Sequence, residues 1–160
     1  MVADQIHFGR IALEPLPHWR FFPLSHQVVA RRNTRCGGLK ISTAWLDDAP
    51  PARSHLESLR LAAQILPDDL EDGEPYQIER LRWPPNSLCG GASVKGTSDF
   101  YRIWYVHEGA HLVAALYACK MNQRRSREAM IELIDCRRLA ESITILSVSD
   151  PVPQPGEPVH

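Results

Sequence analysis

Apolar and polar residues alternate in several short stretches of the chain, with the two-residue period of a half-buried β-strand. Residues 38–46 show this most clearly, because Leu39, Ile41 and Trp45 fall on one side of an extended chain. This pattern, or a short apolar run, predicts strands at residues 8–13, 27–32, 38–46, 76–83, 88–95 and 142–148. Gly and Pro between many of these stretches predict turns.

Two segments carry the signals of helices instead. The first begins at Ser54, which forms a capping box with Glu57, and ends at Pro67. The second follows Ser126, a residue that caps helix N-termini well. Apolar residues at helical spacing predict the buried faces, which are Leu56, Leu59, Ala63 and Leu66 in the first helix and Met130, Leu133 and Ile134 in the second.

Residues 99–119 form a long apolar region and are expected to be a β-hairpin. The stretch from Phe100 to Val106 is rich in aromatic and β-branched residues, which favour strands. Glu108-Gly109 then supplies a two-residue turn, since Gly tolerates a positive φ. This turn predicts the pairs Trp104 with Val113, Tyr105 with Leu112, and His107 with Ala110. The side chains of His107 and His111 then point to opposite faces and do not share a metal.

The same region contains a competing motif, because residues 107–111 spell H-E-x-x-H. On a helix, His107 and His111 would bind one zinc ion and Glu108 would act as general base for a metal-bound water. Glu128 or Glu132 on the second helix would complete such a site. Against this interpretation, Gly109 would lie in the first turn of the catalytic helix, at a cost of about 1 kcal/mol relative to Ala. No capping residue precedes His107 either, so the hairpin is the preferred interpretation.

Charged residues gather in three other segments. Five of the seven residues 68–74 are acidic, and four of the eight residues in the connector 120–127 are basic. Arg31, Arg32 and Arg35 lie in or beside the turn between two predicted strands and offer a place for an anion. Exposed charges are usually only solvated, and solvated loops are the plainer interpretation here. A partner that docks electrostatically on one of these segments is the alternative.

Size and composition limit the functions that are expected. The chain has 160 residues, 44% hydrophobic and 23% charged, which predicts one globular α+β domain over residues 1–148. The Pro-rich segment 149–160 is expected to be a disordered tail. A net charge of −1 argues against a general nucleic-acid binder, and no apolar run is long enough to span a membrane. Four scattered Cys and the absence of a signal-peptide pattern predict a cytoplasmic protein with free thiols.

The predicted order of strands and helices resembles the PsbP-like family, an antiparallel α/β sandwich with helices flanking the sheet. That family includes a photosystem II extrinsic protein, a eukaryotic Ran-release factor and bacterial proteins of unassigned role. The resemblance covers most of residues 6–146. It rests on Pro17-His18-Trp19, Gly90-Gly91-Ala92, residues 102–106, residues 112–117 and residues 139–143. It implies a fold and a role in binding other macromolecules, and it carries over no catalytic residue.

The function expected from these observations is that of a non-enzymatic protein-binding or adaptor module with an unidentified protein partner. The sequence holds no Gly-rich phosphate loop and no nucleophile elbow, and it predicts no catalytic residue and no cofactor. The alternative function is a small zinc-dependent hydrolase, with His107, His111 and Glu128 or Glu132 as ligands and Glu108 as base.

Overall fold

The computed structural model describes residues 5–24, 27–45, 54–66, 74–81, 87–96 and 98–146. The strands are β1 (Ile6–Phe8), β2 (Ile11–Leu13), β3 (Trp19–Pro23), β4 (Gln27–Arg32), β5 (Gly38–Trp45), β6 (Tyr76–Arg80), β7 (Ser87–Lys95), β8 (Asp99–Glu108), β9 (His111–Lys120) and β10 (Thr144–Ile145). The helices are α1 (His55–Ile65), α2 (Arg127–Ser142) and the short 3-10 helix η1 (Met121–Gln123). These elements confirm the α+β class.

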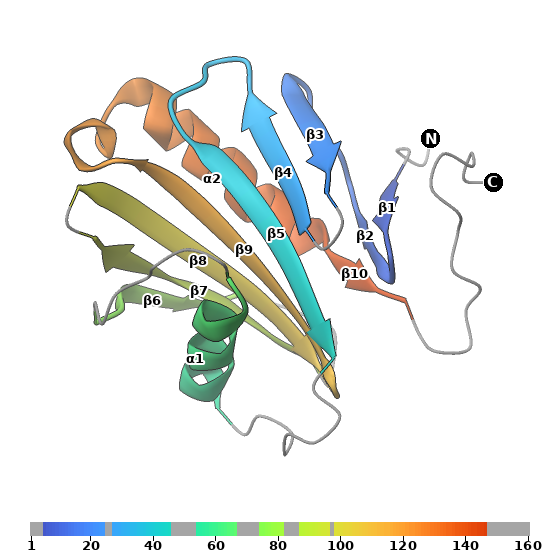
Figure 1. Ribbon diagram of the computed structural model, residues 1–160. Helices are drawn as coiled ribbons and strands as arrows, with labels where there is room; N and C mark the ends of the chain where they lie inside the picture. Colours follow the sequence, from blue (N-terminus) through green and yellow to red (C-terminus); the bar gives the residue numbers. More distant parts are fainter. Residues whose placement is uncertain are drawn as a thin grey trace.

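Two antiparallel sheets and two α-helices form a layered structure (Figure 1). The large sheet has the order β3-β4-β5-β9-β8-β7-β6, and the small sheet has the order β1-β2-β10. Helix α1 covers one face of the large sheet, over β7, β8, β9 and β5. Helix α2 covers the other face and also contacts β2 of the small sheet. The central strands are therefore buried on both sides.

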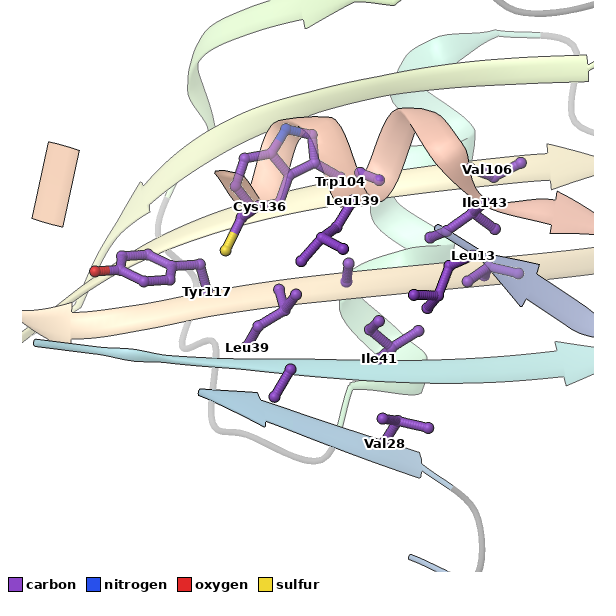
Figure 2. Close-up of a cluster of buried hydrophobic side chains, with 14 of the residues drawn as sticks. Leu13, Val28, Leu39, Ile41, Trp104, Val106, Tyr117, Cys136, Leu139 and Ile143 are labelled. Carbon is purple, nitrogen blue, oxygen red and sulfur yellow. The ribbon is translucent and has the colours of Figure 1, made fainter. Parts of the chain in front are cut away.

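The core divides into two clusters because side chains alternate along β8 and β9. Ile103, Tyr105, Leu112 and Leu116 face α1. Trp104, Val106, Val113 and Tyr117 face α2, where they meet Cys136, Leu139 and Ile143 of the helix and its end (Figure 2). Trp104 is only 2% exposed, as expected for an aromatic residue in a central strand.

The hairpin expected over residues 99–119 is confirmed, but its predicted register was wrong. The turn is Gly109-Ala110, so Glu108 pairs with His111 and Trp104 pairs with Ala115 rather than Val113. Gly109 has φ +57° and stands first in the turn, the position at which a type II′ turn places Gly. The prediction had placed it second. The shift moves every pair by two residues, so each side chain keeps its predicted face.

Two predicted strands also needed correction. Residues 8–13 are not one strand, because the chain turns at Gly9-Arg10 and β1 pairs with β2 as a small hairpin. The closing strand expected over 142–148 is only the short β10, because α2 continues to Ser142. By contrast, residues 27–32 form β4 with the predicted bounds.

The two helix caps are confirmed. The hydroxyl of Ser54 accepts a hydrogen bond from the N–H of Glu57 at 3.2 Å, and the hydroxyl of Ser126 accepts one from Ala129 at 3.1 Å. These bonds satisfy N–H groups that the first turn leaves without a helical acceptor.

The buried faces of the helices were predicted less well. Leu59 of α1 and Leu66 just after its end are buried, but Leu56 is exposed. Ser58 and Ala62 are buried as well. In α2, Met130 and Ile134 are exposed by 55% and 54%. The buried residues of α2 are Ala129, Glu132, Cys136, Leu139 and Ala140. A carboxylate therefore occupies the inner face where an apolar stripe was expected, and its hydrogen bonds explain why.

Two sequence predictions fall mainly outside the residues that the structure describes. The Pro-rich tail 149–160 lies outside the described residues, and the acidic segment 68–74 is described only at Glu74. Within the described part of the chain, no helix is long and apolar enough to cross a membrane.

Candidate interaction surface

The H-E-x-x-H residues lie in the β8–β9 hairpin, so the helix required by the zinc interpretation does not form. His107 faces α1, where its Nδ1 is 2.9 Å from the hydroxyl oxygen of Ser58. His111 and its register partner Glu108 face the opposite side of the sheet, and the His111 ring packs edge-on against Trp45 at 4.0 Å between centroids. The two imidazoles are separated by the sheet and do not form one metal site.

The two glutamates proposed to complete that site are elsewhere. Glu128 is exposed in the first turn of α2. Glu132 lies on α2 and is buried against the end of β9 that is far from the β8–β9 turn. There it contacts Tyr117 and the β4–β5 loop. Among the residues that the structure describes, no three His, Cys, Asp or Glu side chains are grouped so that they could hold a metal ion.

The carboxylate of Glu132 is a hydrogen-bonding centre that the sequence did not reveal. It accepts hydrogen bonds from the backbone N–H of Cys36 at 3.0 Å and of Gly37 at 2.7 Å, and from the hydroxyl of Thr34. The phenol of Tyr117 donates a fourth at 3.0 Å. Burial, and next the nearby Glu132 carboxylate, raise the pKa of Tyr117 above its usual range, so the phenol keeps its proton. A buried carboxylate is tolerated when its oxygens are satisfied in this way.

These bonds fix residues 33–37, the β4–β5 loop, against the start of α2. The sulfur of Cys36 lies 3.7 Å from the hydroxyl oxygen of Ser126 and 3.8 Å from the side-chain carbonyl oxygen of Gln123. Gly37 fits closely, because a Cβ there would overlap the carbonyl oxygen of Ala118. The loop and the 120–127 connector, distant in the sequence, are therefore held in contact.

Basic side chains gather at this end of the large sheet, which we call the cationic end. It consists of Arg31, Arg35, Lys120, Arg124, Arg125 and Arg127. Lys120 is partly neutralised by Asp99 at 3.2 Å, and Arg124 donates a hydrogen bond to the carbonyl of Met121. Arg35, Arg125 and Arg127 are exposed. The sequence predicted two separate basic segments, and the structure brings them together.

Arg32, which the sequence grouped with Arg31 and Arg35, has a different role. Its Nε lies 3.1 Å from Oδ2 of Asp135 on α2, and the indole N–H of Trp19 donates to the same oxygen at 3.0 Å. Asp135 thus ties β3 and β4 to α2. Because its charge is paired in a partly buried contact, Arg32 is not counted in the cationic end.

Comparisons with known proteins identify the fold. No protein-family model matches the chain, and no curated protein matches it. Solved structures do match. One is a crystal structure from Bacteroides thetaiotaomicron with 8% identity and a TM-score of 0.53, which covers 94% of this chain and 51% of that one. The present chain therefore spans about half of the Bacteroides protein.

Another match is the solution structure of cyanobacterial PsbP (CyanoP) from Synechocystis sp. PCC 6803. It has 11% identity and a TM-score of 0.55, and the match covers 91% of this chain and 94% of that one. At these identities the likeness concerns the fold and not the function. The described chain has a PsbP-like α+β fold, as the sequence resemblance implied.

Proposed function

We propose that this protein is a non-enzymatic protein-binding module, and that it binds an acidic surface of its partner at the cationic end. The observation that supports this proposal is the anchoring of the β4–β5 loop by Glu132. Arg35 lies within that anchored loop, and Arg125 and Arg127 flank Ser126, which the loop contacts through Cys36. A binding surface on a fixed backbone loses less conformational entropy on association.

The chemistry of the surface favours carboxylates on the partner. Guanidinium groups offer paired N–H donors that match the geometry of Asp and Glu side chains. Exposed charges of one sign also increase the association rate with an oppositely charged protein, and salt weakens that effect. The net charge of −1 means that the chain as a whole is not basic, which supports a protein partner over a nucleic acid.

Affinity capture with two matched variants tests the proposal. The test variant carries Arg35→Glu, Arg125→Glu and Arg127→Glu. The control carries Arg60→Glu, Arg80→Glu and Arg138→Glu, three exposed positions on α1, β6 and the later part of α2. Both variants change the net charge by the same amount. Parent and control should retain a protein from native lysate that the test variant loses. The association rate of this captured protein with the purified parent should fall as the salt concentration is raised.

Two results would refute the proposal. One is a partner captured equally by both triple variants, which would locate the interface elsewhere. The other is capture that nuclease treatment abolishes, which would identify the ligand as nucleic acid and not protein.

A further inference from the structure

Helix α1 is joined to the sheet by two imidazole–hydroxyl hydrogen bonds. One links the hydroxyl of Ser58 to Nδ1 of His107 at 2.9 Å, and the other links the phenol of Tyr105 to Nδ1 of His55. His55 and Ser58 are three residues apart on α1 and share a face of the helix. Tyr105 and His107 are alternate residues of β8 and share a face of the sheet. Both bonds therefore join the first turn of α1 to one strand.

The contact is dry. Ser58 is 0% exposed, Tyr105 is 2% exposed and His107 is 5% exposed. Leu59, Ala62, Leu112 and neighbouring apolar residues complete the cluster around them. Water is therefore largely excluded from the site at which His107 would acquire a charge, and a buried charge without a counter-ion is costly.

Within the described part of the chain, the strands packed against α1 do not supply such a counter-ion. On the strands packed against α1, the described residues on the helix-facing side include one carboxylate, Asp99, which lies at the far end of β8 beside Lys120. Glu108, Cys89 and His111 belong to the other face. The other described titratable groups near this layer are Lys40 on β5, Tyr101 and Tyr105 on β8, Arg80 on β6, Glu57 and Arg60 on α1, and Glu74, which lines a pocket with Leu56, Leu59 and Arg60 of α1.

We propose that these two hydrogen bonds form an acid-sensitive latch, in which protonation of His107 and His55 under mildly acidic conditions releases the first turn of α1 from β8. Release uncovers apolar side chains of the sheet, including Leu112 and Leu116, that lie in the cluster with α1. The proposal does not depend on the cationic end, which lies at the opposite end of β9.

Protonation acts on the two bonds in different ways. Burial lowers the pKa of His107, against a smaller opposing effect of a hydrogen bond to the Gly109 backbone, so the closed state disfavours the charged ring. Burial, and then the positive charge of Arg80, lower the pKa of His55. Burial raises the pKa of Tyr105, so its phenol remains a donor to Nδ1 of His55. Protonation of that nitrogen removes the acceptor of this bond.

Hydrogen exchange measured on the full chain tests the latch. After correction for the pH dependence of intrinsic exchange, protection of amides in α1 should fall at least tenfold between pH 7.5 and pH 5.5. Each histidine contributes up to tenfold per pH unit below its ordinary pKa of about 6.5. Protection in α2 should change much less, because the helix is held through Glu132 and Asp135 instead.

Variants separate this effect from general acid unfolding. The double variant His55→Gln, His107→Gln keeps polar side chains but cannot titrate, and its α1 protection should not vary with pH. His111→Gln, on the opposite face, should behave like the parent. Equal loss of protection in α1 and α2, or a parent pH dependence that survives in the double variant, would overturn the proposal. If the double variant does not fold, an NMR titration of the parent decides, since a His107 pKa at or above 6.5 excludes the latch.

Discussion

The phenol of Tyr117 donates a hydrogen bond to the carboxylate of Glu132 at 3.0 Å, and both side chains are fully buried. Tyr117 lies on the central strand β9 and Glu132 on α2, so this bond joins the middle of the sheet to the helix above it. The same carboxylate oxygen also accepts a hydrogen bond from the N–H of Gly37 in the β4–β5 loop. The other oxygen accepts hydrogen bonds from the N–H of Cys36 and the hydroxyl of Thr34 in that loop. One side chain thus connects three parts of the fold.

Glu132→Gln should lower the free energy of unfolding by about 1.5–3 kcal/mol, because hydrogen bonds to a charged group are replaced and an amide N–H₂ is placed among donors. Denaturant unfolding measures the effect. The control is Glu128→Gln, an exposed change on the same helix, which should remain within about 0.5 kcal/mol of the parent. Equal effects of the two substitutions would contradict the structural role of Glu132.

Trp104→Ala should lower the free energy of unfolding by about 3–5 kcal/mol, since it removes a large side chain that is 2% exposed. The indole lies against the backbone at Gly91, where a Cβ would approach its Cδ1 to 2.8 Å. Trp45→Ala is the matched control, because Trp45 is 48% exposed and should contribute much less. Thermal or denaturant melts compare the two variants. A similar loss of stability in both would contradict the role of Trp104 in the core.

Stability should decline as the pH falls below about 6.5, the ordinary pKa of histidine. His107 has a lowered pKa in the folded chain, so in this window the unfolded chain binds more protons and gains stability relative to the fold. The slope attributable to His107 is at most about 1.4 kcal/mol per pH unit. Denaturant melts of the parent and His107→Gln across pH 5–8 measure it. A difference between the two proteins that does not vary with pH would refute this assignment.

A strong chelator should leave the melting temperature unchanged, and His111→Ala should respond to the chelator as the parent does. The reason is geometric, since His107 and His111 face opposite sides of the sheet and Glu132 lies at the other end of β9. Melting curves with and without chelator, together with metal analysis of the purified protein, make the test. A chelator-induced decrease in the parent that His111→Ala lacks would restore the zinc interpretation.

The alternating pattern predicted the layers of the fold well, because a half-buried strand must place apolar residues every second position. The exact turn was harder to predict. Side chains alternate along a strand, so a two-residue shift of the hairpin register changes no face. Apolar residues occupy both faces of β9 and give no other signal of the register. The conformation of Gly109 decides the register.

Local sequence patterns could not predict the inner face of α2 or the cationic end, for a different reason. Met130 and Ile134 were expected inside because they are apolar, whereas Glu132 is inside because Thr34, Cys36, Gly37 and Tyr117 supply its donors. These partners are distant from Glu132 in the sequence or come from another element. Helical periodicity considers one segment at a time and cannot include them.

The strand order of the large sheet also bears on how the chain folds. Among the described strands, β3, β4 and β5 form one local meander, and β6, β7, β8 and β9 form another. The two are joined by the ladder between β5 and β9, which pairs Gly38 with Ala118 and Trp45 with His111. Bringing β5 and β9 together closes the long segment of chain between them, which costs conformational entropy before any of these contacts form. Joining of the meanders is therefore expected to limit the folding rate, while each meander can begin to form from contacts close in the sequence.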